Sequence, residues 1–97
     1  IYETTDTFPQ EQKSILISQM QRAAISIPSN IAEGFARQHT KEYKQFLYYS
    51  LGSCSELETQ LIIAQSRKYL PGDKYSELAK LLDYESRMLM NLIKSLG

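Results

Sequence analysis

Residues 26–37 read SIPSNIAEGFAR, and this stretch decides how the rest of the chain is interpreted. It sets Pro28 inside a run of helix-forming residues and then reaches Gly34, a residue that often stops a helix. On a helical wheel of about 100° per residue, the polar side chains in and before this stretch fall within an arc of roughly 80°. These polar residues are Gln19, Arg22, Ser26, Asn30, Glu33 and Arg37. An apolar arc lies beside them, made of Leu16, Met20, Ala23, Ala24, Ile27, Ile31 and Phe35. The pattern predicts an amphipathic helix with a polar stripe along the edge of its core face.

The polar stripe has three interpretations. It can be a solvated rim, because Glu33 and Arg37 are spaced i, i+4 as in any exposed helix. It can be a structural network that closes a helical bundle, or it can be a catalytic or ligand-binding site. The residues alone leave these alternatives open.

Glu85 favours the network. Its apolar neighbours at positions 78, 81, 82, 88, 89 and 92 are all Leu or Met. An ionised carboxylate inside such a stripe costs several kcal/mol unless it is paired. We expect Glu85 to lie inside the bundle and to bond to Arg22 first, with Gln19 or Asn30 as the next candidates. The predicted structural network is therefore Gln19, Arg22, Asn30, Glu33 and Glu85.

The remaining helix start and stop signals predict an all-α chain that forms a single domain over residues 1–97. One helix is expected over 10–36, bent at Pro28, and the next over 41–68. The sequence YLPGD at 69–73 breaks the pattern, and a last helix is expected over 74–95. Alternation typical of strands is absent from the sequence.

Composition excludes several classes of function. Eleven basic and eleven acidic residues cancel in a chain of 97, so no global field attracts nucleic acid or an anionic membrane. The one cysteine, Cys54, and the one histidine, His39, lack the spacing of a metal site, and Cys54 is expected to be a buried thiol. We expect no cofactor, no metal and no membrane partner. Nothing in the sequence resembles a signal peptide or a membrane-spanning run, so the cytoplasm is the expected location.

The helix predicted over 41–68 is apolar on two sides. Its core face carries small residues that allow close approach of a neighbour. Four apolar residues project roughly opposite that face: Tyr48, Leu51, Ile62 and Ile63. A helix that is apolar on both sides is usually buried on both sides, so this flank predicts an oligomer interface.

Several motifs resemble the four-helix-bundle proteins of the 23S rRNA intervening-sequence family. They are the F-P-x-E pattern at residues 8–11, SIPSNIAEGFAR, GSCSELETQL at 52–61 and RMLMNLIKSL at 87–96. This family is similar to the accessory variability determinant protein of diversity-generating retroelements. The resemblance implies an antiparallel up-down four-helix bundle that assembles as a ring, most simply a homopentamer, with no established enzymatic activity. It also implies that the first helix is largely missing from this chain, with residues 1–6 as its tail.

The predicted function is that of a non-catalytic, ring-forming scaffold in the bacterial cytoplasm that contacts RNA, DNA or a nucleic-acid-processing partner. Direct support comes from a basic cluster at the turn between the first two predicted helices, opposed only by Glu42. This cluster is Arg37, His39, Lys41 and Lys44. The alternative is a pure protein-interaction module that does not bind nucleic acid.

A third interpretation is an enzyme acting on a small molecule through Asn30, Glu33 and Glu85. It lacks a phosphate-binding loop, a metal-ligand set and a nucleophile–base pair. We therefore expect no small-molecule substrate.

Overall fold

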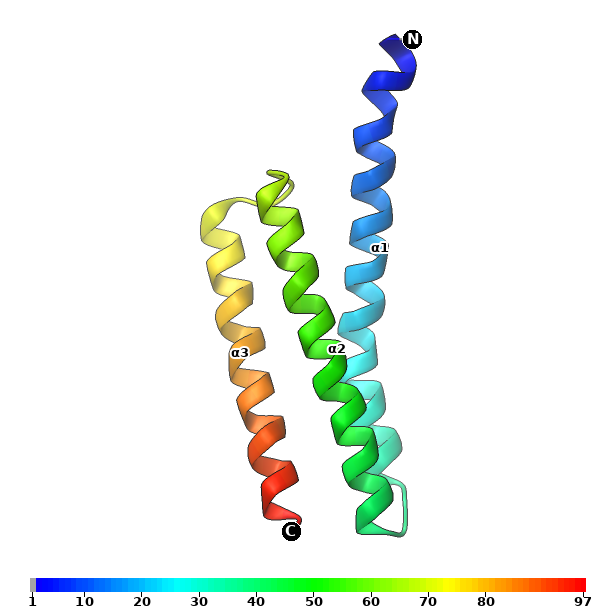
Figure 1. Cartoon of the computed structure of the whole chain (residues 1–97), viewed down its shortest axis with the longest axis vertical. Helices are drawn as coiled ribbons and strands as arrows, with labels where there is room; N and C mark the ends of the chain where they lie inside the picture. Colours follow the sequence, from blue (N-terminus) through cyan, green and yellow to red (C-terminus); the bar gives the residue numbers. More distant parts are fainter. Residues whose placement is uncertain (1) are drawn as a thin grey trace.

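Three antiparallel α-helices make up the fold (Figure 1). The computed structural model describes the backbone of residues 2–97 and the side chains of residues 10–97. Helix α1 spans Tyr2–Phe35, α2 spans Thr40–Ser66 and α3 spans Gly72–Ser95. The prediction of an all-α chain is confirmed, and the described residues form no strand. The expected four-helix bundle is corrected to three helices within this chain.

Helix α1 is longer than the sequence pattern predicts. The predicted helix starts at residue 10, but α1 begins at Tyr2 and continues without interruption through Pro9 and Pro28. Each proline removes one backbone donor, which is a local loss that a long helix can absorb. Residues 2–6 therefore belong to the same helix and not to the tail of a separate one, and Ile1 lies outside the described residues.

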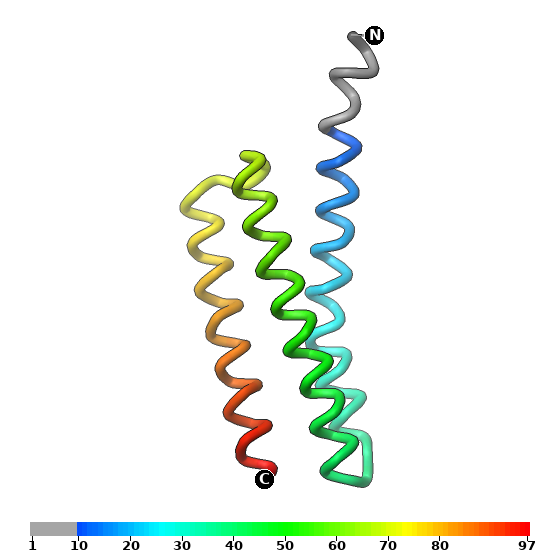
Figure 2. The backbone as a smooth tube through the Cα atoms, in the orientation of Figure 1, coloured from blue at the N-terminus to red at the C-terminus, as the bar shows by residue number. Residues whose placement is uncertain are grey.

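The helices form a layer that is one helix deep. Helix α2 lies between the other two and contacts both, whereas no described Cα of α1 comes within 8 Å of a Cα of α3. The backbone trace shows the same order of helices (Figure 2). The Cα atoms extend over 57 × 24 × 13 Å, with a radius of gyration of 16.5 Å. A compact domain of this length would have a radius of about 13 Å. The chain therefore leaves more of its surface open than a closed bundle does.

The core lies along α2. Its buried residues are Ile27 from α1, Leu47, Cys54 and Leu61 from α2, and Leu82, Leu89 and Ile93 from α3. Small side chains allow α1 and α2 to approach closely. A Cβ atom placed on Gly34 would lie 2.7 Å from the Cβ of Phe46 and 3.2 Å from the backbone oxygen of Tyr43. Gly34 has no positive φ, so close packing is the reason for a glycine at this position.

Two turns connect the helices. The first covers residues 36–39, and His39, whose backbone is extended, precedes the first residue of α2. The second follows Lys68, which adopts a left-handed conformation with φ of +62°. The Tyr69 amide then donates to the Ala64 carbonyl at 2.9 Å, which closes the end of α2. Pro71 directly precedes α3.

Candidate functional site

Part of the predicted polar stripe forms a structural network between α1 and α2. Asn30 Nδ2 donates to both the backbone oxygen and the Oγ of Ser26, each at 2.9 Å. Ser53 Oγ donates to Ser26 Oγ at 2.9 Å, which links α2 to α1. Ser50, which is fully buried, donates to the Ile27 carbonyl at 2.8 Å. Asn30 is therefore half-buried and held by neighbouring hydroxyl and carbonyl groups at the helix contact.

The other stripe residues of α1 lie at the surface. Gln19 and Arg22 are exposed. Glu33 Oε1 accepts a hydrogen bond from Arg37 Nη2 at 2.8 Å, and both side chains are well exposed. An exposed pair of this kind contributes about 0–1 kcal/mol. The stripe thus divides into a helix–helix contact at Ser26 and Asn30 and a solvated rim elsewhere.

Glu85 is not where the sequence-based prediction placed it. Its side chain is exposed on α3, and it forms no hydrogen bond or ion pair with any side chain that the structure describes. The expected bond to Arg22, Gln19 or Asn30 is therefore wrong for the single chain. The physical reason is the separation of α1 from α3, because the two helices meet only through α2.

An apolar groove occupies the space between α1 and α3, and α2 forms its base. One stretch of the groove has a volume of about 890 Å³ and a second has about 320 Å³. Ala24, Leu57 and Glu85 line both stretches, so the two are continuous. The other lining residues from α1 are Ile17, Met20, Gln21, Ile27, Pro28 and Ile31. The other lining residues from α2 and α3 are Leu61, Leu78, Leu81, Leu82, Tyr84, Met88, Leu89 and Leu92.

The three residues of the enzyme interpretation do not come together. Glu85 lines the groove, Asn30 bonds to Ser26, and Glu33 pairs with Arg37 at the surface. Neither Asn30 nor Glu33 lines either stretch of the groove.

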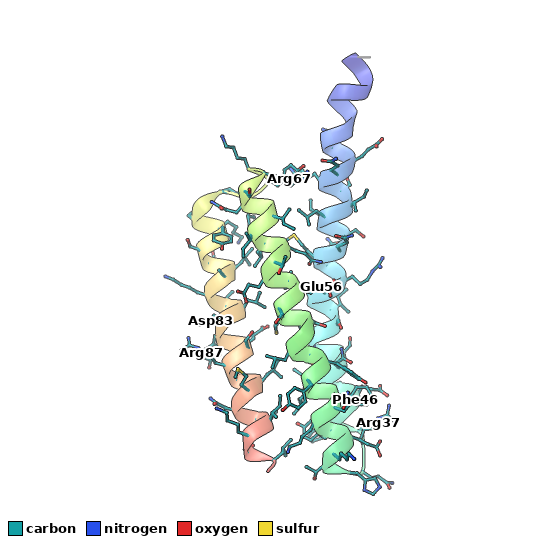
Figure 3. All side chains as sticks on the ribbon, in the orientation of Figure 1. Arg37, Phe46, Glu56, Arg67, Asp83 and Arg87 are labelled. Carbon is teal, nitrogen blue, oxygen red and sulfur yellow. The ribbon has the colours of Figure 1, made fainter. Side chains whose placement is uncertain are left out.

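The predicted basic cluster gathers at the α1–α2 turn. His39 and Lys41 are exposed and Lys44 is half-buried. Arg37 pairs with Glu33 and also lies over the Phe46 ring, with 4.7 Å between Cζ and the ring centroid. Arg37 and Phe46 lie together at this end of the molecule in Figure 3. The charge of Arg37 is therefore partly neutralised within the chain.

Aromatic side chains lie at the same turn as this basic cluster, and they were not part of the predicted site. Phe35 is 77 % exposed and packs edge to face against Tyr43, with ring centroids 6.0 Å apart. Phe46 packs in the same way against Tyr49 at 5.5 Å. The signal in the sequence was the density of aromatic residues between positions 35 and 49. Cations beside exposed aromatic rings can bind an anionic chain that carries flat groups, such as a single-stranded nucleic acid.

Three of the four residues of the predicted oligomer flank are exposed on α2. Tyr48, Ile62 and Ile63 are exposed by 56 %, 50 % and 39 %. Leu51 is half-buried and packs against the core, so its assignment to the outer flank is corrected. From here we call Tyr48, Ile62 and Ile63 the outer apolar face.

Cys54 is a buried free thiol, as expected. Burial raises the pKa of this thiol, a hydrogen bond with Ser86 lowers it, and the nearby charge of Glu85 raises it. The thiol is therefore kept protonated in the core. The described side chains include no group of three or more His, Cys, Asp or Glu residues that could hold a metal ion. Within the same part of the chain, no helix has both the length and the apolar character needed to cross a membrane.

The sequence profile described as 23S rRNA-intervening sequence protein matches residues 1–91. The chain belongs to this family. A comparison with curated proteins gave no significant match. The range shared with the 23S rRNA-intervening sequence family includes the polar contact between α1 and α2, the basic turn, the outer apolar face and Glu85. The matched range thus includes every surface described above, except for the last residues of α3.

Proposed function

We propose that this member of the 23S rRNA-intervening sequence family is a non-catalytic scaffold that assembles as a homo-oligomeric ring of five subunits. We further propose that the ring contacts RNA, DNA or a nucleic-acid-processing partner in the bacterial cytoplasm. We also propose that this chain is related to the accessory variability determinant protein of diversity-generating retroelements.

The main support for an oligomer is the large area of exposed surface. The chain exposes 7187 Å², whereas a compact monomer of 11.2 kDa exposes about 5,700 Å². The excess of roughly 1,500 Å² includes the walls of the groove between α1 and α3 as well as surface that neighbouring subunits can cover. A subunit of a closed ring has two neighbours and therefore needs two contact surfaces. The outer apolar face is a suitable part of this contact surface.

Light scattering on the purified protein tests the assembly. We expect a single species near five times the chain mass of 11.2 kDa at tens of micromolar protein. A monodisperse monomer under these conditions would contradict the proposal, and a dimer would contradict the ring.

Support for nucleic-acid contact comes from the basic and aromatic residues at the α1–α2 turn. His39, Lys41 and Phe35 are all exposed at or next to this turn, and a ring would repeat this weak patch in every subunit. Repetition raises the overall affinity even when each contact is weak. Binding of labelled single-stranded RNA and duplex DNA, measured at about 50 and 200 mM salt, tests this contact because phosphate contacts weaken steeply with salt.

The alternative is a protein-interaction module that does not bind nucleic acid. The pairing of Arg37 with Glu33 favours it, because this pair removes one cation from the basic cluster. Failure to bind either nucleic acid at low salt would favour this alternative and leave the oligomer unaffected.

We also propose that the groove between α1 and α3 is the position of a fourth helix, which would complete an antiparallel four-helix bundle. Support comes from the continuous apolar walls of the groove and from the resemblance to four-helix-bundle proteins. A fourth helix seated there would contact both α1 and α3, whose described Cα atoms do not come within 8 Å of each other.

A further inference from the structure

Glu85 is the one charged side chain that lines the groove between α1 and α3, within the part of the chain whose side chains are described. It lies where the two stretches of the groove join. The nearest arginine along α3, Arg87, bonds to Asp83 at 2.8 Å on the outer side of the helix (Figure 3). Arg22 of α1 does not line the groove. The Glu85 carboxylate is thus left without a cation in an apolar setting.

The opposite wall of the groove is mostly apolar. Its residues from α1 include Ala24, Ile27, Pro28 and Ile31. The groove therefore presents the Glu85 carboxylate from α3 between walls that are otherwise almost entirely apolar.

The length of the groove suits a helix. Its lining residues run from Ile17 to Ile31 on α1 and from Leu78 to Leu92 on α3. Each run corresponds to a rise of roughly 21 Å, or about four helical turns. A helix with only apolar side chains on the facing side would cover Glu85 and leave its charge buried and unpaired, which is strongly unfavourable.

We propose that the helix seated in this groove carries one arginine or lysine in the middle of its apolar face, and that Glu85 binds this cation and fixes the register of the helix. This inference rests on the proposed position of the fourth helix and adds the chemistry that the groove selects. The cation donates to the Glu85 carboxylate. Exclusion of water by the surrounding apolar side chains strengthens this interaction.

The test uses labelled helical peptides of about 20 residues and the full chain. One peptide carries leucines on its apolar face with a single central arginine. A second peptide has leucine in place of that arginine, and a third has the same composition as the first but with the arginine moved to the polar face. Binding is followed by fluorescence anisotropy with the wild-type protein, with Glu85→Gln and with Glu77→Gln. Glu77 is the matched control, because it is an exposed glutamate of α3 that does not line the groove.

We expect the wild-type protein and Glu77→Gln to bind the first peptide at least about tenfold more tightly than the other two. In Glu85→Gln this preference should fall below about twofold. Equal binding of all three peptides to the wild-type protein would overturn the role of Glu85 and leave the proposed helix position intact. No binding of any peptide at about 100 µM would overturn both.

Discussion

Replacing Gly34 by alanine adds one methyl group at a position where α1 and α2 leave no space for it. The added Cβ would lie 2.7 Å from Phe46 Cβ, 3.1 Å from a ring carbon of Tyr43 and 3.2 Å from the Tyr43 backbone oxygen. Carbon atoms in contact are ordinarily about 3.5–4.0 Å apart. Two of the three crowded atoms belong to the backbone or are directly attached to it, so rotation of a side chain cannot relieve the overlap.

The magnitude follows from two opposing effects. Overpacking of this kind costs about 1–3 kcal/mol, and the rigid neighbours place Gly34 at the upper end. Alanine favours the helix by about 1 kcal/mol over glycine, which offsets part of that cost. The expected net loss in the free energy of unfolding is therefore about 2 kcal/mol. Gly52→Ala is the matched control, because Gly52 lies inside α2 with nothing within 4 Å of the added Cβ. This control should be stabilised by up to about 1 kcal/mol.

Urea denaturation followed by far-UV circular dichroism measures the difference, at one protein concentration for all variants. A second comparison identifies the contact that is responsible. Phe46→Ala retains its Cβ, so Gly34→Ala should remain costly in that background. Phe46→Gly removes the Cβ, and there the penalty should shrink. If Gly34→Ala proves as stable as Gly52→Ala, the close-packing explanation is refuted.

Three further predictions concern the surfaces and the core. Ile62→Asp should reduce the mass found by light scattering toward that of the monomer, whereas Met90→Asp, a similarly exposed apolar position on α3, should leave it unchanged. Replacing Lys41 and Lys44 together by Glu should weaken RNA binding and lower the slope of log affinity against log salt by about 2, and an unchanged slope would exclude these lysines from the contact. Native Cys54 should react with iodoacetamide much more slowly than the urea-unfolded chain, because burial raises the pKa of its thiol. The folded state favours the neutral thiol over the ionised one. This contribution to the free energy of unfolding is fully present below the pKa of the unfolded thiol and is lost as the pH rises through the pKa of the folded thiol. Cys54→Ala should therefore lose less stability than the wild type on the alkaline side.

Helix positions could be predicted from the sequence to the extent that local chemistry fixes them. The YLPGD sequence at 69–73 marks the break between α2 and α3, because a proline disfavours a helical conformation of the residue before it and is well suited to a helix start, and Pro71 directly precedes α3. The continuity of α1 across Pro9 could not be predicted in this way. A proline preceded by a phenylalanine is compatible with either a helix start or a helix interior, and only the surrounding contacts decide between them.

The candidate site was only partly predictable, because a helical wheel does not show which neighbour covers each side. The apolar arc of α3 is wider than α2 alone can cover. Leu82, Leu89 and Ile93 pack against α2 and are buried, whereas Leu81 and Met88 face the groove and remain more than half exposed. Glu85 lies on the uncovered side of the same arc. The helical wheel correctly predicted that these residues share one face of α3. It could not show that α2 covers only one side of that face and leaves the other side open to the groove.

The absence of contact between α1 and α3 in the described residues also affects how the chain opens and closes. Helix α3 is attached to the rest of the fold only through α2. It can therefore detach without disturbing the serine hydroxyl bonds and the close packing at Gly34 that join α1 to α2. Detachment of α3 is therefore a partial unfolding step of low free energy. In this step the amide hydrogens of α3 exchange with solvent while those of the α1–α2 pair stay protected. Most contacts join helices that follow each other in the chain, an arrangement that favours rapid folding, with the α1–α2 hairpin as the base onto which α3 docks. Any helix that bridges the groove would connect α3 to α1 and merge these two units into one cooperative transition.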